Sequence, residues 1–575
     1  MDKSDIVKVF EEMRAILELR GENVFRIRAF ENGARALEDW EGDLEEMVES
    51  GGLTSIHGIG KGLATIITDL IQKGRSEDYE EMRASIPITL LELLRIPGVG
   101  SKKARVLYEK LGITSLAELE EACREQRLRT LRGFAAKSES EILSRIERLK
   151  RYQKRHVLPL AEQVAKRFLE RLRGAPGVVR LAVAGSLRRC METIGDLDIL
   201  VATTDVPAAR EVFLAEPSII ERVAQGEQKC RVMVQEEVEV DLRAVEPHCF
   251  AAALHYFTGS KQHNMRMRAV ARERGWKLNE YGLWNEQGAL LPCPEEEDIF
   301  RHLGFAYLPP ELREDQGEVE QAAQLSEWPL LVEESQLKGA LHCHTVASDG
   351  QATLREMAEG AQARGWEYLG IADHSRSSVQ AGGLSVERLR AQRQEIETLN
   401  QELRGFTLLH GVECDILPDG SLDFPEDVLA ELDYVVVSVH SSLTLSRREQ
   451  TARIEKALRH PCTSIWGHPS ARLLLKREPL ALDMDYLLRV AREEGVVVEI
   501  NGQPRRLDLD WRWGPRVREL GITTAINPDA HRVEGLDHVR YGIGVARKAG
   551  LEPQQVVNTL PLQQLKTRLK ERTLK

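Results

Sequence analysis

The chain has 575 residues, a formal net charge of −12 at neutral pH, 42% hydrophobic and 30% charged residues. This length exceeds what one hydrophobic core organises and suggests about four domains. The amino terminus lacks the apolar core of a secretion signal, and no run of 18 apolar residues occurs, so we expect a cytoplasmic protein without membrane contact. Eight cysteines without CxxC pairs argue against a disulfide or zinc-finger framework.

Residues 1–80 are predicted to form short amphipathic helices, and residues 81–155 repeat that pattern. Two similar segments interrupt the helices, IHGIGKGLA (56–64) and IPGVGSKKA (96–104). In each, glycines predict a tight turn whose backbone N–H groups point outward at the start of a helix and bind a phosphate without reading a base. Ordinary helix-helix turns are the alternative, but repetition favours a common function. A third segment, LRGFAAKSE (131–139), keeps one glycine and looks degenerate.

Basic residues are concentrated in one part of the chain, although the net charge of the chain is negative. Residues 100–155 carry 15 Lys and Arg against 8 Asp and Glu, whereas residues 1–50 carry 7 against 14. A basic stretch in an acidic chain is expected of a phosphate-binding surface, although a solvated helix face gives the same pattern. The residues predicted to contact the DNA backbone in these turns are Gly58, Gly60, Gly98, Gly100, Lys102 and Lys103.

From about residue 157 the pattern changes to β-rich runs interleaved with helices, which predicts an α+β region. GDLDIL (195–200) places Asp196 and Asp198 on one face of a strand, and Asp241 belongs to a later strand that can lie beside it. Three carboxylates next to the glycine-serine loop GSLRR (185–189) can hold two magnesium ions and bind a triphosphate. An acidic surface strand is the alternative, but apolar neighbours make unpaired carboxylates costly here.

Pro309 and Pro310 precede a polar linker that leads into the last region, residues 336–575. There six short apolar stretches each run into a metal-type ligand, and VVVEI (496–500) adds a seventh strand. A β/α barrel places its chemistry at the carboxyl ends of its strands, so these residues should meet at one mouth. Nine ligands suit two or three divalent ions and attack of water on a phosphoester. They are His342, His344, Asp349, His374, Glu413, His440, His468, Asp529 and His531.

The paired glycine turns resemble the helix-hairpin-helix motif of DNA-binding proteins. GSLRR, GDLDIL and VDLR (240–243) match the motifs of the nucleotidyltransferase core of family X DNA polymerases, and the likeness extends from the amino terminus to about residue 315. YFTGSKQHNMRMR (256–268) matches the segment that contacts the incoming nucleotide and the template. The resemblance implies four parts: a helical domain (1–80), helix-hairpin-helix fingers (81–155), a nucleotidyltransferase palm (156–246) and a thumb (247–315).

By this resemblance Asp196, Asp198 and Asp241 are catalytic, Arg243 helps to orient them, and Arg268 lies along the template strand. The implied nucleotide-binding residues are Gly185, Ser186, Arg189, Tyr256, Phe257, Gly259 and Asn264.

Three departures from the family pattern carry predictions. Cys190 occupies a common glycine position and Ile194 replaces a phosphate-contacting serine, so nucleotide affinity is expected to be lowered. Ile66 stands where members that excise a 5′-deoxyribose phosphate carry a Schiff-base lysine, and isoleucine has no amine, so negligible lyase activity is expected from the N-terminal domain.

Residues 336–575 resemble the polymerase and histidinol phosphatase (PHP) domain, a distorted (β/α)7 barrel, with residues 316–335 as linker. The resemblance rests on H-C-H, S-D-G, D-H, G-V-E, V-H-S, G-H-P and D-A-H, and every ligand position is filled. It implies one ion held by His342, His344, Glu413 and Asp529. Glu413 would bridge to a second ion on His440 and His468, and Asp349, His374 and His531 would hold a third.

A family X core followed by a PHP barrel is the order found in bacterial and archaeal family X polymerases. We therefore expect a monomeric enzyme of base excision repair that fills short gaps in gapped or primed DNA from deoxynucleoside triphosphates, with Mg²⁺ or Mn²⁺. The barrel, with Mn²⁺ or Zn²⁺, would be a 3′–5′ exonuclease, and AP endonuclease or 3′-phosphodiesterase activity stays open. The alternatives are a nucleotidyltransferase acting on RNA or a small molecule, fused to a PHP phosphatase, and a non-catalytic DNA-binding scaffold.

Overall fold

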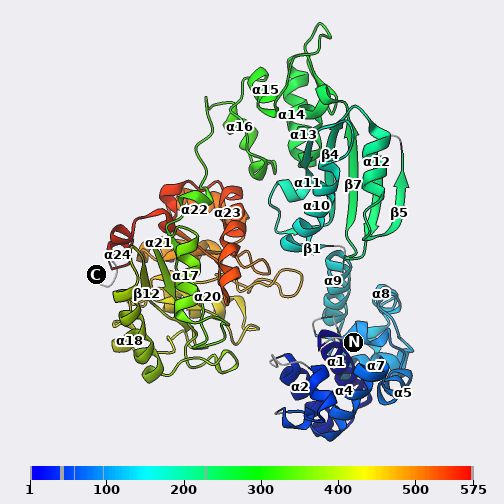
Figure 1. The fold of residues 1–575 in the computed structure, drawn as a ribbon, viewed down its shortest axis with the longest axis vertical. Coiled ribbons are helices and arrows are strands. Elements are labelled where there is room, and N and C mark those ends of the chain that lie inside the picture. The colour runs from blue at the N-terminus through cyan, green and yellow to red at the C-terminus, as the bar shows by residue number, and fades with distance from the viewer. Residues whose placement is uncertain are drawn as a thin grey trace. The chain divides into compact units, whose positions relative to one another are not determined.

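The computed structural model describes residues 3–38, 44–56, 58–94, 96, 98–131, 133–153, 155–226 and 229–570. Positions 57 and 97 of the two hairpin segments, and position 132 of the third, lie outside the described residues. The chain divides into two units, Met1–Lys154 and Arg155–Lys575 (Figure 1). Among the described helices, none is long and apolar enough to cross a membrane.

The first unit is helical and has two separate hydrophobic cores. One core takes residues between Ile6 and Met82, and the other takes Leu19 and residues between Leu90 and Ile146. The helices are α1 (Lys3–Arg20), α2 (Val24–Glu38), α3 (Leu44–Glu49), α4 (Lys61–Lys73), α5 (Glu77–Ala84), α6 (Leu90–Leu93), α7 (Ser101–Leu111), α8 (Leu116–Arg124) and α9 (Ala136–Gln153).

The two predicted glycine turns directly precede α4 and α7. Gly58 and Gly98 have φ angles of 97° and 82°, in the left-handed region that glycine occupies without steric cost. The next residues, Ile59 and Val99, donate their backbone N–H groups to the carbonyl three residues earlier, at 3.0 and 2.9 Å. Both apolar side chains are buried, so each turn is fixed to its core and leaves the first N–H groups of the following helix unbonded within that helix.

The third segment forms the same turn before α9, although it keeps only one glycine. Gly133 has a φ of 92°, and the N–H of Phe134 donates to the carbonyl of Leu131 at 3.1 Å. Phe134 is buried, as Ile59 and Val99 are in the other turns. A left-handed glycine followed by a buried apolar residue therefore suffices for this turn.

The second unit begins with a mixed sheet of strand order β2-β4-β7-β6-β5. The central strands β4 and β7 run parallel, and the other pairs are antiparallel (Figure 1). The strands are β2 (Val178–Val183), β4 (Asp196–Thr203), β5 (Ile219–Gln225), β6 (Lys229–Val234) and β7 (Glu239–Val245), and a separate pair joins β1 (His156–Val157) to β3 (Thr193–Ile194).

Alternation along β4 assigns its side chains to two faces. Leu197, Ile199 and Val201 join the core with α10 (Leu158–Arg173) and α12 (Val206–Leu214). Leu200 and Ala202 pack against α13 (Phe250–Thr258). Because strand side chains alternate with a period of two, Asp196 and Asp198 belong to the face that carries α13.

A smaller core follows, built around α14. Its elements are α14 (Lys261–Glu273), β8 (Lys277–Asn279), β9 (Gly282–Trp284), α15 (Glu296–His302) and α16 (Glu318–Ala322), and α11 (Gly185–Arg188) is the short helix between β2 and β3.

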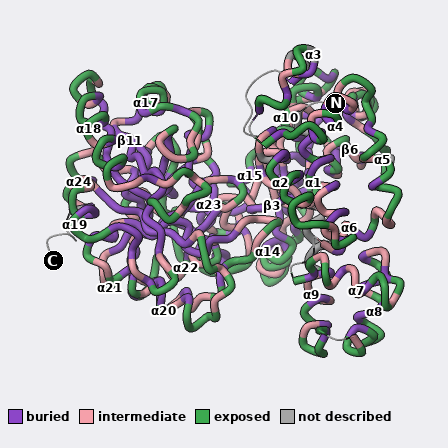
Figure 2. The backbone as a smooth tube through the Cα atoms, turned by 90° about the horizontal axis from the view of Figure 1, so that it is seen from below, coloured by how far each residue is buried: buried purple, intermediate pink, exposed green. Residues whose placement is uncertain are grey.

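The last region is a barrel of parallel strands in two hydrogen-bonded sheets, β10-β11-β12 and β13 to β17. Bridges between Cys343 and Ala530 and between His374 and Glu413 join the sheets. Since β12 and β13 are separated by two residues, they occupy one strand position, and the predicted distorted seven-stranded barrel is confirmed. Figure 2 shows its buried strands surrounded by more exposed helices. The strands are β10 (Gly339–Ala340), β11 (Tyr368–Ile371), β12 (Thr407–His410), β13 (Glu413–Asp415), β14 (Val436–Ser438), β15 (Ile465–Trp466), β16 (Val497–Asn501) and β17 (Thr524–Asn527).

The helices around the barrel are α17 (Leu354–Ala363), α18 (Val386–Glu402), α19 (Glu426–Leu429), α20 (Arg447–Leu458), α21 (Met484–Glu494), α22 (Gly514–Leu520), α23 (Val539–Lys548) and α24 (Leu562–Lys570).

Two glycines of the first hairpin should respond oppositely to alanine. At Gly58 a Cβ would lie 3.2 Å from Ala36 Cβ and the φ is 97°, so Gly58→Ala should destabilise α4 by roughly 1–2 kcal/mol. Gly62 lies inside α4 with no described atom within 4 Å of a Cβ, so Gly62→Ala should stabilise it by up to about 1 kcal/mol. Amide hydrogen exchange of α4 in the full chain measures both effects, and equal responses would contradict this account of the turn.

Candidate active sites

The three predicted aspartates come together on β4 and β7. Asp198 is the direct register partner of Asp241 on the neighbouring parallel strand, and Asp196 lies two residues before Asp198 on the same face. Asp196 is exposed, Asp198 is half-buried and Asp241 is buried. The three carboxylates therefore become progressively more buried from Asp196 to Asp241.

The glycine-serine turn lies directly against Asp198. A Cβ on Gly185 would fall 2.2 Å from Asp198 Oδ2, and the φ of Gly185 is 60°, so glycine alone fits both the space and the backbone. The N–H of Ala184 donates to the carbonyl of Asp198 at 2.8 Å. A phosphate on this turn would consequently lie next to the carboxylates.

The carboxylates repel one another in this arrangement. Burial raises the pKa of Asp198 to about 6, and the neighbouring charges of Asp196 and Asp241 add to the rise. A divalent cation between carboxylates reverses such a shift, because it stabilises their ionised forms. The donor set of three carboxylates in one place therefore fits hard cations such as Mg²⁺.

The arginine that contacts Asp241 is one that the sequence analysis missed. Arg231 donates through Nε and Nη2 to the two oxygens of Asp241, at 2.6 and 2.8 Å. Arg243, the residue implied by resemblance, lies 3.8 Å from Asp241 and stacks over Phe257 instead. Arg231 is the register partner of Asp241 on β6, and this pairing leaves no local signal in the sequence.

The predicted nucleotide segment forms the end of α13 and the start of α14. Tyr256 and Phe257 meet edge to face with ring centroids 5.2 Å apart. Asn264 Nδ2 donates to the carbonyl of Tyr256 at 2.6 Å, and Arg268 Nε donates to the carbonyl of Asn264 at 3.3 Å. The bond from Asn264 joins the two helices across the turn at Gly259, whose φ is 70°, whereas the bond from Arg268 lies within α14.

Arg189 contacts the same turn. Its guanidinium donates to the carbonyl of Thr258, and its Nε donates to Glu314 at 2.9 Å. A Cβ on Gly259 would lie 3.1 Å from Arg189 Nη1, so the missing side chain at 259 admits the arginine. The predicted triphosphate contact of Arg189 stays a prediction and would require exchange of these bonds.

All nine predicted ligands of the barrel gather at the carboxyl ends of its strands, with Glu413 at the centre. Five imidazoles surround this carboxylate. The nitrogen to oxygen distances to Glu413 are 2.8 Å for His468, 3.0 Å for His374, 3.3 Å for His440, 3.5 Å for His342 and 3.7 Å for His344. Burial alone would raise the pKa of Glu413, but the neighbouring histidines, His440 foremost, hold it well below its usual range.

Three subsets of these residues can each place their ligand atoms within 4.8 Å of one another. The subsets are His344, Asp349, His374 and His531; His342, His344 and Asp529; and His374, Glu413 and His440. Within the described chain, several buried imidazole nitrogens of the site make no hydrogen bond of normal geometry, although most of them face a carboxylate oxygen at 3.0 Å or more, and a bound metal would satisfy them. They are Nε2 of His342, Nδ1 and Nε2 of His344, Nδ1 of His374, Nε2 of His440 and Nδ1 of His468. The donor set fits divalent cations.

Two further carboxylates orient ligands from behind. Glu499 Oε1 lies 2.7 Å from Nδ1 of His342, and Asp415 Oδ1 lies 2.5 Å from Nδ1 of His440. Such a bond fixes the ring and leaves the opposite nitrogen for a metal. Neither residue is among the predicted ligands, although Glu499 is the acidic residue inside the apolar run 496–500.

The cationic residues of the second hairpin differ in their surroundings. Lys102 is exposed, whereas Lys103 donates to the carbonyl of Gly98 at 2.9 Å and lies 5.6 Å from the ring centroid of Phe134. Lys103 therefore stabilises the turn.

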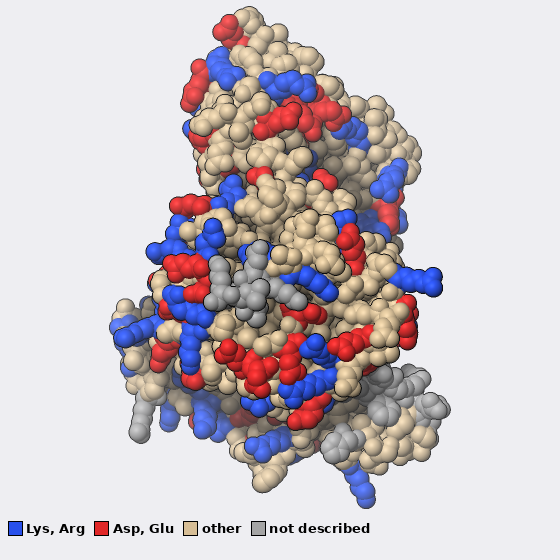
Figure 3. Space-filling view, turned by 90° about the vertical axis from the view of Figure 1, so that its left-hand side faces the viewer, with Lys and Arg blue, Asp and Glu red and all other residues tan. Residues whose placement is uncertain are grey.

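Ile66 is buried in α4, as an apolar core residue. On the face drawn in Figure 3, acidic and basic side chains are interspersed.

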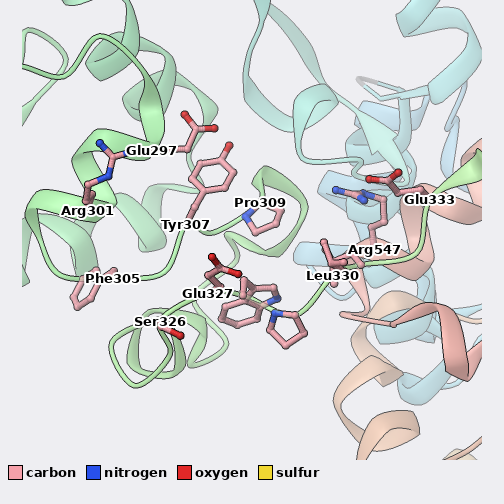
Figure 4. A pocket seen from close by; sticks show the side chains of 13 residues that line it. Glu297, Arg301, Phe305, Tyr307, Pro309, Ser326, Glu327, Leu330, Glu333 and Arg547 are labelled. Carbon is pink, nitrogen blue, oxygen red and sulfur yellow. The ribbon is translucent and has the colours of Figure 1, made fainter.

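A pocket of about 480 Å³ lies next to α15 and the segment before the barrel (Figure 4). Tyr307, Trp328 and Leu330 line it together with Arg547 of α23. None of the residues that line it belongs to the predicted catalytic or ligand sets.

A mixed sheet with a carboxylate triad, joined to a histidine-rich parallel barrel, defines a two-site metal-dependent enzyme of phosphoester chemistry. Four family profiles match the chain: a helix-hairpin-helix domain over residues 1–76, a SAM-like helix-hairpin-helix tandem over 90–148, a DNA polymerase beta thumb over 253–314 and a PHP domain over 340–503. Divalent metal ions are implied by the PHP domain and by the ligand groups of the barrel.

Relatives agree with these profiles. The DNA polymerase/3′-5′ exonuclease PolX of Bacillus subtilis is 39% identical over 573 residues, which span 99% of this chain and 100% of that protein. DNA polymerase lambda of Rattus norvegicus is 27% identical over 45% of this chain and 48% of its own length. A probable phosphatase of Thermoanaerobacter is 27% identical over 41% of this chain and 95% of its own length. The chain belongs to the bacterial family X DNA polymerases that carry a C-terminal PHP domain.

Glu499→Gln should weaken metal binding in the barrel while the fold persists. The substitution removes the negative charge behind His342, and loss of such a partner typically lowers metal affinity about 10–100-fold. Equilibrium dialysis with Mn²⁺ measures the effect. Glu519→Gln, on the exposed side of α22, is the control and should bind metal as the parent does. Equal affinity of Glu499→Gln and the parent would remove this carboxylate from the site.

Proposed function

We propose that the chain is a DNA polymerase that fills short gaps with deoxynucleoside triphosphates and carries a 3′–5′ exonuclease in its PHP domain. The observation that carries the first activity is the register pairing of Asp198 with Asp241, with Gly185 packed against Asp198. The triphosphate and the catalytic cations would thereby bind next to each other. The 39% identical relative, named as a DNA polymerase and 3′–5′ exonuclease, supports both activities.

At the polymerase site, Asp196, Asp198 and Asp241 would hold Mg²⁺ or Mn²⁺. Bound cations neutralise charge on the phosphates and make the primer 3′-hydroxyl easier to deprotonate. Arg231 holds the Asp241 carboxylate by two bonds and so fixes its orientation.

Around the nucleotide, Gly185 and Ser186 would contact the triphosphate. The Tyr256 and Phe257 rings would pack against the sugar, and Asn264, which is bonded to the Tyr256 carbonyl, would keep that wall in place and reach the base edge.

In the PHP domain, the nine ligands would hold two or three Mn²⁺ or Zn²⁺ ions that activate water and neutralise the phosphodiester. Glu499 and Asp415 orient His342 and His440. Arg506 Nε lies 3.3 Å from Asp529, and its buried Nη1 has no partner among the described residues, so it can contact a substrate phosphate.

Removal of a 3′-phosphate is a second candidate activity of the barrel. The resemblance of this region to a probable phosphatase supports it. Gapped DNA with a 3′-phosphate and gapped DNA with a 3′-hydroxyl, incubated with Mn²⁺, separate the two activities by their products, inorganic phosphate and nucleoside monophosphate.

The finer organisation is part of the same proposal. The chain would comprise the six parts 1–80, 81–155, 156–246, 247–315, 316–335 and 336–575, and act as a monomer in the cytoplasm. The hairpin turns would bind the DNA backbone on gapped or primed substrates.

The two activities should separate by substitution. Asp241→Ala removes a buried carboxylate of the polymerase site, so extension of gapped DNA should fall by orders of magnitude while trimming persists. Conversely, His344→Ala should abolish trimming and spare extension. A labelled primer on gapped DNA, with and without nucleotides, reports both. Loss of both activities in a folded Asp241→Ala protein would contradict the two-site proposal.

DNA binding should be insensitive to sequence and should weaken steeply with salt. Lys102→Ala should flatten the slope of log affinity against log salt by about one unit per lost phosphate contact. Lys73→Ala, at the far end of α4 and paired with Asp69, should leave the slope unchanged. Salt titrations of the full chain on labelled gapped DNA measure this. An unchanged slope for Lys102→Ala would exclude that residue from the interface.

A further inference from the structure

Within the second unit, two elements of the PHP domain contact the segment that follows the glycine-serine turn. They are η7 (Trp511–Trp513) and α23, and the segment is residues 189–192, between α11 and β3. Neither the catalytic carboxylates nor the barrel ligands take part, so the proposed chemistry leaves this contact without a role.

Lys548, at the end of α23, is the central residue of the contact. Its side chain is fully buried. The ammonium donates to the carbonyl of Arg189 at 3.0 Å, to the carbonyl of Glu311 at 3.1 Å and to Glu314 Oε1 at 2.6 Å, so all three of its donors are used. Because Arg189 Nε donates to the same Glu314 oxygen at 2.9 Å, Lys548 and Arg189 share one carboxylate.

Glu192 forms a second attachment three residues later. This glutamate is 8% exposed, and its carboxylate accepts bonds from Trp511 Nε1 at 3.0 Å and Arg512 Nη1 at 2.7 Å. Two separate elements of the PHP domain thus hold both ends of a four-residue segment. Bonds that join a buried charge to its partners are the ones that fix geometry most firmly.

The held segment is bonded directly to the turn. The N–H of Arg189 donates to the carbonyl of Gly185 at 3.3 Å, and the N–H of Met191 donates to the carbonyl of Ser186 at 3.1 Å. A displacement of residues 189–192 would consequently be passed to the two residues that are proposed to contact the triphosphate.

We propose that the PHP domain positions the nucleotide-binding turn of the polymerase site, with Lys548 as the positioning residue. The inference rests on the proposed role of Gly185 and Ser186. The predicted effect is on nucleotide binding rather than on turnover, because Asp198 and Asp241 are held by β4 and β7 and have no bond to α23 among those described. The PHP domain thereby contributes to nucleotide binding at the polymerase site although Lys548 does not contact the nucleotide.

Lys548→Met tests the contact, since methionine has a similar length and no donor. In the full chain, the KM for deoxynucleoside triphosphate on gapped DNA should rise about tenfold, as expected for loss of a hydrogen bond to a charged group, with kcat within about twofold of the parent. Trimming of 3′ ends should be unchanged, which also reports folding. Arg540→Ala is the matched control, because Arg540 lies on the same helix but bonds Glu162 of α10 at 2.7 Å. It should leave KM unchanged.

Glu192→Gln weakens the other attachment of the same segment and should raise KM in the same direction, so it tests the positioning role even if Lys548→Met does not fold. An unchanged KM in a trimming-competent Lys548→Met protein would overturn the inference, as would an equal rise in Arg540→Ala. Ser186→Ala separates this failure from that of the proposed function. If Ser186→Ala leaves KM unchanged, the proposed nucleotide site is wrong; if it raises KM and Lys548→Met does not, only the positioning role is wrong.

Discussion

Electrostatic repulsion between carboxylates on neighbouring strands is the constraint on which the polymerase site depends. Paired residues of adjacent parallel strands lie about 4.8 Å apart. Asp198 and Asp241 are such a pair, and both are withdrawn from water to different degrees. Burial, together with the neighbouring charges of Asp196 and Asp241, raises the pKa of Asp198 to about 6, so this carboxylate takes up a proton more readily than a free one does. The two bonds from Arg231 compensate the Asp241 carboxylate, and a divalent cation bound between the three carboxylates would compensate the others.

The barrel also brings many ligands together in a buried site, but most of them are histidines rather than carboxylates. There one buried carboxylate, Glu413, has five imidazoles around it, and the nine ligands comprise six histidines and three carboxylates. Parallel strands end at the same rim, so most ligands that are distant in sequence meet there, while Asp349 reaches the cluster from the turn that follows β10. Glu499 and Asp415 then fix ring orientations from inside the barrel wall. Softer nitrogen-rich and harder oxygen-rich sites in one chain are suited to different metal ions.

Much of both sites could be predicted from the sequence because the relevant signals are local. Alternation places Asp196 and Asp198 on one strand face, and apolar runs that end in His440 or His468 mark strand ends. What escaped prediction depends on pairing between distant segments. Arg231 contacts Asp241 only because β6 lies next to β7, and Glu499 contacts His342 only because the barrel closes.

The third hairpin looks degenerate in sequence because it keeps one glycine, yet it forms the same turn. The turn depends on one left-handed glycine, Gly133, and a buried residue after it, Phe134. The backbone condition, rather than the full motif, decides the geometry.

Cys190 shows how a departure from a family pattern is accommodated. Its φ is 51°, the left-handed region where a side chain is disfavoured, which explains why glycine is common at this position. The side chain still has to be placed, and it packs against α23 of the PHP domain. A Cβ on Gly544 would lie 3.3 Å from both Cβ and Sγ of Cys190, so the thiol fits because position 544 has no side chain. The side chain at position 190 is therefore accommodated by the packing of two domains against each other. A larger residue at position 190 or at position 544 would push the two domains apart. The close approach of α23 to Cys190 also brings Lys548 within reach of the carbonyl of Arg189. A residue at position 190 that pushed α23 away would therefore also break the contact that holds the nucleotide-binding turn.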